Sequence, residues 1–335
     1  MKAVGFHVNR PATEAEALVD MELPEPSPGA RDLVVRIDAS GLNPIDTKLR
    51  MRVTPEPGQA KVLGYDAVGT VVAVGSEARL FNVGDAVFYA GSMLRQGSNA
   101  QLQVVDERLV GRKPASLDAT AAAALPLTAI TAWEMLFHKF RLPRGGQKQG
   151  VLLVLGGAGG VGSILIQLAR QLTGLTVVAT ASRPESRQWC LEMGAHHVID
   201  HKGSLGEQLT ALGIGGVDYT ACLTASDQHI DAVVALTNPF GEACVIDDLT
   251  RLDFAAAKRK SMTLHWEFMF ARSNFQTADM DEQGKLLNEV ADLVDRGVLR
   301  STLAEVVEGL SAYNLRQAHL RQESGRSIGK LAIRH

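Results

Sequence analysis

A short apolar run that ends in a glycine cluster constrains the fold of this chain most strongly. Residues 151–155 are Val-Leu-Leu-Val-Leu, and within the glycine-rich stretch 156–162 the glycines Gly157, Gly159 and Gly162 fit the G-x-G-x-x-G spacing of a dinucleotide-binding turn. In this interpretation the first two glycines let the backbone approach a pyrophosphate at a helix N-terminus, and the third lets the helix pack on the strand. The alternative is a glycine-rich turn with a structural role only. The residues expected to surround the pyrophosphate are Gly157, Ala158, Gly159, Gly160, Val161 and Gly162.

The residues after the glycine cluster continue a strand–helix alternation. Apolar residues recur at helical spacing from Val161 to Leu172, Gly174 ends this helix, and residues 175–179 have the composition of a second buried strand. Such alternation is typical of a parallel sheet covered by helices on both faces, which is the doubly wound Rossmann architecture. The further helices are expected at 187–193, 205–212 and 227–236, and the further strands at 197–200, 217–222 and 242–246.

The end of the second strand indicates which dinucleotide binds. A carboxylate about twenty residues past the glycines would hold the free ribose hydroxyls of NAD, but Ser182 stands there, and Arg183 and Arg187 follow. A serine and two arginines can bind a 2′-phosphate, so the sequence predicts NADPH as the cofactor. His201, after the next strand, could lie beside the same phosphate, although a lone histidine is more often an ordinary surface residue. The alternative for the whole segment is a solvated loop that opens a helix at Pro184.

The rest of the chain has a different pattern on either side of this unit. Short β-like runs separated by glycine and proline fill the first 125 residues, and an amphipathic helix at 282–296 precedes a β-like tail. We therefore expect a β-rich catalytic domain made of residues 1–125 with 272–335, and a Rossmann NADPH-binding domain made of residues 126–271.

Composition narrows the possible partners and location. The net charge of −3 gives no electrostatic basis for binding nucleic acid, and Lys258-Arg259-Lys260 is the only basic cluster. No apolar run is expected to span a membrane, and the N-terminus lacks the apolar core of a signal peptide. The three cysteines lie scattered through the predicted nucleotide domain, as expected for free thiols in a reduced compartment. We expect a cytoplasmic protein that binds neither nucleic acid nor membrane.

Six segments in order resemble the medium-chain dehydrogenase/reductase superfamily. The resemblance implies a GroES-like β-rich N-terminal domain, a six-stranded Rossmann domain, and a homodimer joined through Rossmann edge strands, with residues 261–270 supplying the edge strand. The matching segments are 41–48, 63–75, 83–87, 125–132, 156–162 and 328–330.

The resemblance also shows where this chain departs from zinc-dependent members. Asn43 stands where those enzymes have a first cysteine ligand, Gly-Tyr65-Asp66 replaces Gly-His-Glu, and Leu127-Thr128 offers no thiolate. No cysteine precedes Cys190, so the four-cysteine structural zinc lobe is missing as well. Because zinc needs three or four N, S or carboxylate ligands, we predict no metal. The segment Asn43-Pro-Ile-Asp resembles the zinc-independent quinone oxidoreductase branch, whose relatives are often named zinc-type alcohol dehydrogenase-like.

This resemblance implies an NADPH-dependent reductase of quinones or α,β-unsaturated carbonyls. Asn43 and Tyr65 are the candidate catalytic residues, Asn43 as an amide donor to the developing oxyanion and Tyr65 as a donor of a hydrogen bond or proton. Thr128 would lie near the nicotinamide ribose, and Lys330 would approach the cofactor or active site from the C-terminal tail. The alternatives are a turn residue at Asn43, a space-filling Tyr65, a helix-capping Thr128 and a solvated Lys330.

Two other functions stay open at this point. A zinc-dependent alcohol dehydrogenase is disfavoured by the missing ligands. A protein that binds NADPH without turnover, serving a structural or nucleic-acid-associated role, would show no NADPH consumption with any acceptor.

Overall fold

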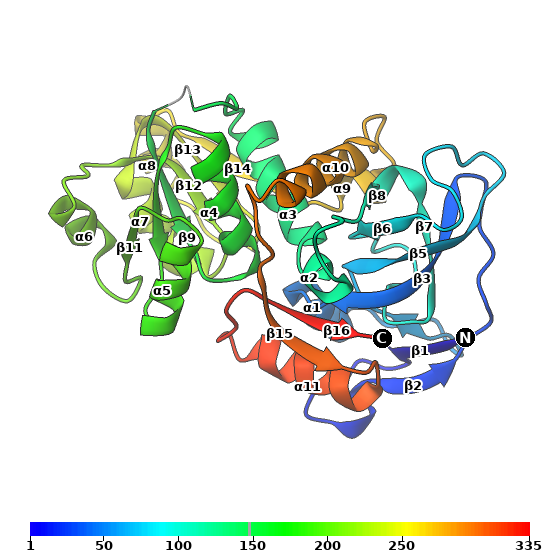
Figure 1. Cartoon of the computed structure of the whole chain (residues 1–335). Helices are drawn as coiled ribbons and strands as arrows, with labels where there is room; N and C mark the ends of the chain where they lie inside the picture. The colour runs from blue at the N-terminus through cyan, green and yellow to red at the C-terminus, as the bar shows by residue number, and fades with distance from the viewer. Residues whose placement is uncertain (147–148) are drawn as a thin grey trace. The chain divides into compact units, whose positions relative to one another are not determined.

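The computed structural model describes residues 1–146 and 149–335, and the chain divides into two compact units. Unit 1 comprises Met1–Ile130 and Phe270–His335, and unit 2 comprises Thr131–Met269. The sequence pattern predicts the two boundaries after residues 125 and 271. Figure 1 shows the strands of unit 1 in blue, cyan, orange and red and those of unit 2 in green and yellow.

Unit 2 contains a six-stranded parallel sheet in the order β11-β10-β9-β12-β13-β14. The first strand of the unit, β9, is central, and the chain adds strands on one side of it and then on the other. This reversal creates a topological switch point at the carboxyl ends of β9 and β12, where ligands of open α/β sheets bind. The strands are β9 (Val151–Leu155), β10 (Thr176–Thr180), β11 (His197–Ile199), β12 (Val217–Cys222), β13 (Thr237–Val245) and β14 (Thr263–Trp266).

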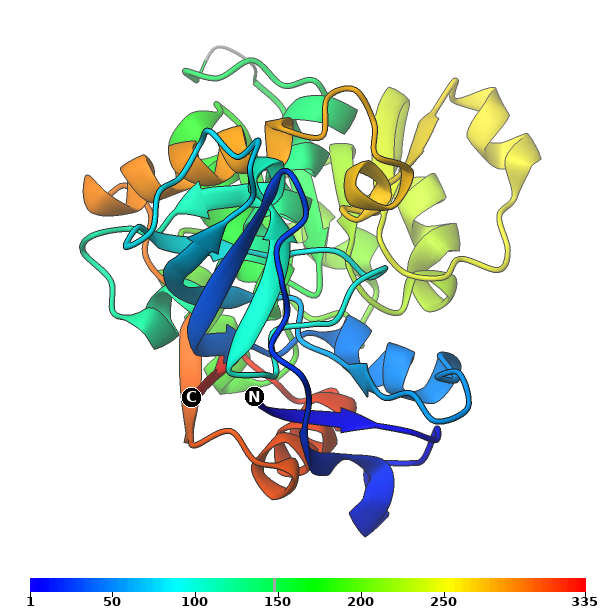
Figure 2. The same ribbon diagram turned by 90° about the vertical axis from the view of Figure 1, so that its right-hand side faces the viewer.

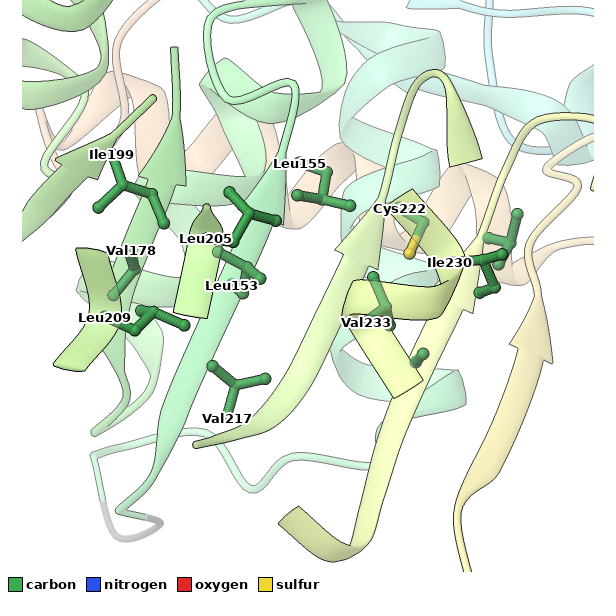
Figure 3. Close-up of a cluster of buried hydrophobic side chains, with 12 residues drawn as sticks. Leu153, Leu155, Val178, Ile199, Leu205, Leu209, Val217, Cys222, Ile230 and Val233 are labelled. Atoms are coloured by element: carbon green, nitrogen blue, oxygen red, sulfur yellow. The ribbon is translucent and has the colours of Figure 1, made fainter. Parts of the chain in front are cut away.

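Helices cover both faces of this sheet, and its central strand β9 is accordingly wholly apolar. Leu153 and Leu155 of β9 belong to a buried cluster with side chains of α6 and α7, whereas the alternate residues Leu152 and Val154 are buried on the opposite face. Figure 3 shows the buried cluster that contains Leu153 and Leu155. Helix α4 packs on β9 and β10. The helical elements are α4 (Gly160–Leu172), α5 (Pro184–Glu192), α6 (Leu205–Ala211), α7 (Ser226–Leu236), α8 (Phe254–Arg259) and a π-helix, η3 (Glu134–Lys139).

Unit 1 is built around a seven-stranded sheet in the order β15-β16-β3-β5-β6-β8, with β7 paired to β3, and a three-stranded sheet β2-β1-β4. Both chain termini lie in this unit (Figure 2). Its strands are β1 (Lys2–Phe6), β2 (Val19–Glu22), β3 (Asp32–Gly41), β4 (Lys61–Val62), β5 (Ala67–Val74), β6 (Ala86–Tyr89), β7 (Leu102–Asp106), β8 (Val110–Arg112), β15 (Leu303–Glu308) and β16 (Lys330–Arg334).

The helices of unit 1 occupy the connections between these strands and the C-terminal region. They are α1 (Pro44–Arg52), α2 (Ala119–Ala123), α9 (Ala271–Phe275), α10 (Glu282–Asp295) and α11 (Ala312–Glu323), with two 3₁₀ turns, η1 (Ala15–Ala17) and η2 (Glu107–Leu109). Helix α3 (Pro126–Trp133) carries the chain from unit 1 into unit 2. The fold class expected from the sequence, a β-rich GroES-like domain plus a doubly wound Rossmann domain, is confirmed.

Three element boundaries differ from the sequence prediction by three residues or more. Helix α5 begins at Pro184 rather than at residue 187, because proline fits the first helical turn and Ser186 accepts the N–H of Arg183 in a capping arrangement. Strand β13 begins five residues earlier than expected, at Thr237, despite its internal proline. Strand β14 ends at Trp266, so the second half of the predicted strand 261–270 is not part of the sheet.

One apolar stretch is longer than the sequence pattern suggests. Residues 119–139 form consecutive helical segments that are long and apolar enough, by length and composition alone, to cross a membrane. Of its most apolar window, 89% is buried inside the protein, as in the core helices of proteins that cross no membrane.

Candidate functional site

The glycine turn after β9 forms a cradle at the N-terminus of α4 in unit 2. Gly156 has φ +82°, a conformation that L side chains rarely adopt, and a Cβ there would lie 2.7 Å from Thr224 Cγ2. Gly159 is the N-cap of α4, with φ −74°. In the described parts of the chain, no group accepts the backbone N–H of Gly160, Val161 or Gly162, which are the orphan donors of a helix N-terminus. These donors and the helix dipole make the turn a ready anion site.

The three motif glycines have different tasks. A Cβ at Gly157 would lie 2.7 Å from Ala179 Cβ and 3.1 Å from Cys190 Sγ, so this glycine permits packing against the neighbouring strand and helix. Close packing therefore gives Gly157 a task beside the phosphate approach expected from the sequence. A Cβ at Gly159 would meet only the Gly156 carbonyl oxygen, at 3.6 Å, and the rest of its surroundings are open. Gly162 lies so close to the turn that its Cβ would stand 2.5 Å from that same oxygen, as expected for the third glycine.

The three residues predicted to bind a 2′-phosphate, Ser182, Arg183 and Arg187, have different surroundings in the structure. Ser182 follows the end of β10 and is half-buried. Arg183 is the N-cap residue of α5, and its Nε lies 3.3 Å from the Glu185 carboxylate. The Arg187 guanidinium donates to the carbonyl oxygens of Ala181 (3.2 Å) and Val198 (2.8 Å). Arg187 thus ties together the ends of two strands, a role that its sequence position does not reveal.

His201 is not isolated, as a lone surface histidine would be. Its ring lies edge-on to that of His229 on α7, with 6.2 Å between centroids. Burial and the proximity of His201 lower the pKa of His229. His229 is not predicted from the sequence, because nothing within α7 distinguishes it from an ordinary helix residue.

The second group of predicted residues meets in unit 1, around Asp66. The Lys330 ammonium donates to the Asp66 carboxylate (2.9 Å) and to the Asn43 side-chain oxygen (2.5 Å). The Asn43 amide nitrogen donates to Asp66 Oδ2 (2.8 Å) and to the Tyr65 carbonyl (3.3 Å). The other Asp66 oxygen accepts the N–H of Leu127 at the start of α3 (2.7 Å).

The contacts of Asn43, Lys330 and Thr128 bear on three of the roles weighed from the sequence. Both amide hydrogens of Asn43 are already donated inside the protein, which leaves none for the oxyanion of an acceptor. Lys330 is buried rather than solvated. Thr128 lies in the first turn of α3, and its hydroxyl donates back to the carbonyl of Leu125 (3.0 Å), the residue that precedes this helix. It therefore does not cap the helix N-terminus.

Asp46 is a buried carboxylate that is not among the site residues predicted from the sequence. Its two oxygens accept the backbone N–H groups of Asn43 and Gly64, each at 2.9 Å, so that it caps helix α1 and holds the Gly64-Tyr65 turn. Burial nevertheless raises the pKa of Asp46 to about 7. Burial likewise raises the pKa of Asp66, and the positive charge of Lys330 opposes that rise.

Tyr65 provides the one polar side-chain atom of this group without a partner in the described structure. Its side chain is fully buried, its ring meets Phe270 edge-on at 5.4 Å, and its hydroxyl has no hydrogen-bond partner. Burial and the Asp46 charge raise the pKa of the phenol, which therefore stays neutral. A neutral, unpartnered phenol can donate a hydrogen bond or a proton to a ligand.

The donor set around Asp66 does not fit zinc. The Asn43 oxygen and one Asp66 oxygen accept from an ammonium, both Asp46 oxygens accept backbone N–H groups, and Tyr65 is a neutral phenol. Zinc requires thiolate, imidazole or carboxylate ligands that are free to coordinate. Residues 1–146 and 149–335 contain no cluster of three or more His, Cys, Asp or Glu side chains that could hold a metal ion.

Comparisons with known proteins agree with this architecture. Residues 29–122 match the family model of the alcohol dehydrogenase GroES-like domain, and residues 193–333 match that of a zinc-binding dehydrogenase. A zinc-type alcohol dehydrogenase-like protein of Staphylococcus aureus (strain MRSA252) is 41% identical over 99% of both chains.

Two solved structures have the same fold as this chain. A crystal structure described as a putative zinc-dependent alcohol dehydrogenase from Rhizobium etli is 48% identical, with a TM-score of 0.94 over 100% of this chain and 98% of that one. The Escherichia coli quinone oxidoreductase complexed with NADPH has the same fold, with a TM-score of 0.86 over both whole chains at 24% identity. The chain therefore belongs to the medium-chain dehydrogenase/reductase superfamily and is an oxidoreductase of that family.

Proposed function

We propose that this protein is an NADPH-dependent reductase of quinones or α,β-unsaturated carbonyls that works without a metal, in the zinc-independent quinone oxidoreductase branch of its family. The observation that carries the proposal is the buried group of Tyr65, Asp66 and Lys330. It offers a neutral phenol as a donor, and its own ammonium supplies the positive charge. Oxidation of a simple alcohol needs a group that lowers the pKa of the hydroxyl, whereas a conjugated acceptor delocalises the charge that hydride addition creates.

The glycine cradle supports the NADPH-binding part of this proposal. The open space at Gly159 and the free N–H groups of Gly160–Gly162 fit a pyrophosphate. Ser182 and Arg183 are the groups we assign to the 2′-phosphate, with Arg187 holding the strand ends on which they stand. When bound, NADPH supplies the hydride.

The acceptor half is assigned to Tyr65. Its hydroxyl would donate to the acceptor oxygen as negative charge develops there, and the neutral phenol keeps this hydrogen available across the physiological pH range. Asn43 is assigned to orienting Asp66 and the Tyr65 backbone rather than to contact with the acceptor.

NADPH consumption with a panel of quinones and a panel of enones tests this proposal. We expect turnover with at least one panel, a preference for NADPH over NADH, and no loss of activity after dialysis against a chelator. Tyr65→Phe should lower kcat tenfold or more, because it removes the donor to the acceptor oxygen. Absence of turnover with both panels, or one tightly bound zinc per chain with activity lost on chelation, would contradict the proposal.

We also propose a cytoplasmic homodimer. Strand β14 is an edge strand of the unit 2 sheet, and the aromatic side chains of Trp266 and Phe268 beside it are 55% and 46% exposed. The cysteines Cys190, Cys222 and Cys244 are buried free thiols, which suits a reducing compartment. Sedimentation analysis that finds a monomer at micromolar concentration would contradict the dimer.

A further inference from the structure

The side chain of Lys330 is saturated by three oxygen acceptors. Its Nζ donates to the Leu42 carbonyl (2.6 Å), to the Asn43 side-chain oxygen (2.5 Å) and to the Asp66 carboxylate (2.9 Å), and only 4% of the side chain is exposed. An ammonium has three hydrogens to donate, so none is left for a cofactor or an acceptor. The sequence-based expectation that Lys330 contacts the cofactor therefore gives way to another role.

The backbone around Lys330 is fixed as firmly as the side chain. Its N–H donates to the Thr302 carbonyl (2.8 Å), and the next carbonyl, of Leu331, accepts the N–H of Leu42 (3.0 Å). Strand β16 pairs with β3 on one side and with β15 on the other. The last strand of the chain thus delivers a cation to the point where β3 ends and α1 begins.

The charges at this point explain why a cation is needed. Asp46 and Asp66 are both fully buried, and a buried ion without a partner strongly destabilises the folded state. Asp46 compensates with two backbone N–H groups, whereas Asp66 relies on Lys330, Asn43 and the Leu127 N–H. The positive charge of Lys330 lowers the pKa of both carboxyl groups against the effect of burial.

We propose that Lys330 is the positioning residue of the acceptor site, acting as a built-in cation that holds the Asn43 loop, the Tyr65-Asp66 turn and the start of α3 in register. Its ammonium orients the Asn43 amide, which donates to the carbonyl of Tyr65, and so it fixes the backbone from which the Tyr65 phenol extends. This assignment rests on the proposed function only for its effect on turnover.

Chemical rescue with a small amine tests the assignment. Lys330→Ala removes the ammonium and opens a cavity, and ethylammonium can enter it as a substitute cation with three N–H donors. Lys330→Met fills the same space without a charge. Lys285→Ala is the matched control, because Lys285 also pairs with two carboxylates but is 59% exposed on α10. Tetramethylammonium, which has no N–H, controls for ionic strength.

For turnover, we expect kcat to fall at least 100-fold in Lys330→Ala and Lys330→Met, with the NADPH Kd within threefold of the wild type. Ethylammonium should restore kcat at least tenfold in Lys330→Ala and not in Lys330→Met. Both variants should also shift the acidic limb of the kcat–pH profile to higher pH, since loss of the ammonium lets burial raise the pKa of Asp46 and Asp66 further. The control variant should match the wild type throughout.

For stability, the Tm of Lys330→Ala should rise with ethylammonium and not with tetramethylammonium. This readout needs no turnover, so absence of activity in the wild type would refute the proposed function while leaving the built-in cation testable. Wild-type kcat and pH profile in Lys330→Met would overturn the assignment. So would equal effects of ethylammonium on the Tm of both variants, or failure of both variants to fold, which would make the role of Lys330 structural only.

Discussion

Alanine substitutions at two glycines of the cradle separate packing from ligand binding. At Gly162 an added Cβ would lie 2.5 Å from the Gly156 carbonyl oxygen and 2.6 Å from that of Gly157. Both neighbours are backbone atoms, so the turn or the helix must move. At Gly159 the nearest atom would be 3.6 Å away and φ is −74°, so alanine fits the protein itself.

The magnitudes follow from these distances. Overpacking of this kind costs about 1–3 kcal/mol, and the helical preference of alanine over glycine returns about 0.5–1 kcal/mol. Because the clash at Gly162 is with two backbone oxygens, the upper part of this cost, about 2–3 kcal/mol, applies. Gly162→Ala should therefore lose about 1–2.5 kcal/mol, a Tm decrease of a few degrees. Gly159→Ala should keep the wild-type Tm but bind NADPH at least tenfold more weakly, a change of about 1.4 kcal/mol, because its methyl group stands where the pyrophosphate is expected.

Thermal unfolding with and without NADPH, combined with NADPH titration followed by fluorescence, measures both effects. Gly215→Ala is the control, since a Cβ there would meet nothing within 4 Å. Wild-type NADPH affinity in Gly159→Ala would refute the placement of the pyrophosphate, and wild-type stability in Gly162→Ala would refute the packing argument.

Three further variants test other parts of the structure. Arg183→Ala should raise the NADPH Kd about tenfold or more and leave the NADH Kd unchanged, because a charge-assisted contact to a phosphate is worth about 1.5–3 kcal/mol; equal losses for both cofactors would exclude a 2′-phosphate contact. Arg50→Ala should destabilise the protein by about 2–3 kcal/mol, since the guanidinium is buried and pairs with Glu323, which is itself a third exposed; a change below about 0.5 kcal/mol in denaturant unfolding would contradict this. Burial and the neighbouring Glu134 raise the pKa of Glu267, so the folded protein keeps this carboxyl protonated while the unfolded chain ionises it. The protonated Glu267 carboxyl therefore stabilises the folded protein fully below the ordinary carboxyl pKa, and this stabilisation is lost as pH rises toward the raised value. Because glutamine cannot ionise, Glu267→Gln should be more stable than the wild type between about pH 6 and 9. A constant difference across that range would refute the assignment.

The local patterns of the sequence predict the Rossmann unit well. The strand, glycine turn and helix at residues 151–172 are predicted correctly, because a buried strand, a turn that requires glycine and an amphipathic helix each leave a signal within a dozen residues. Boundaries fail where a neighbouring group decides them, as at α5, where Ser186 caps the helix, and at β14, where the pairing with β13 ends.

The predicted site residues Asn43, Tyr65 and Lys330 do meet in the structure, together with Asp66, but the sequence could not say what they do there. Lys330 lies 264 residues from Asp66 along the chain, and only the pairing of β16 with β3 brings its ammonium to that carboxylate. Glycine spacing and apolar periodicity are encoded locally, since each residue of such a pattern constrains its own neighbours. Which buried charge neutralises which is decided by long-range strand pairing, and the tertiary structure alone reveals it.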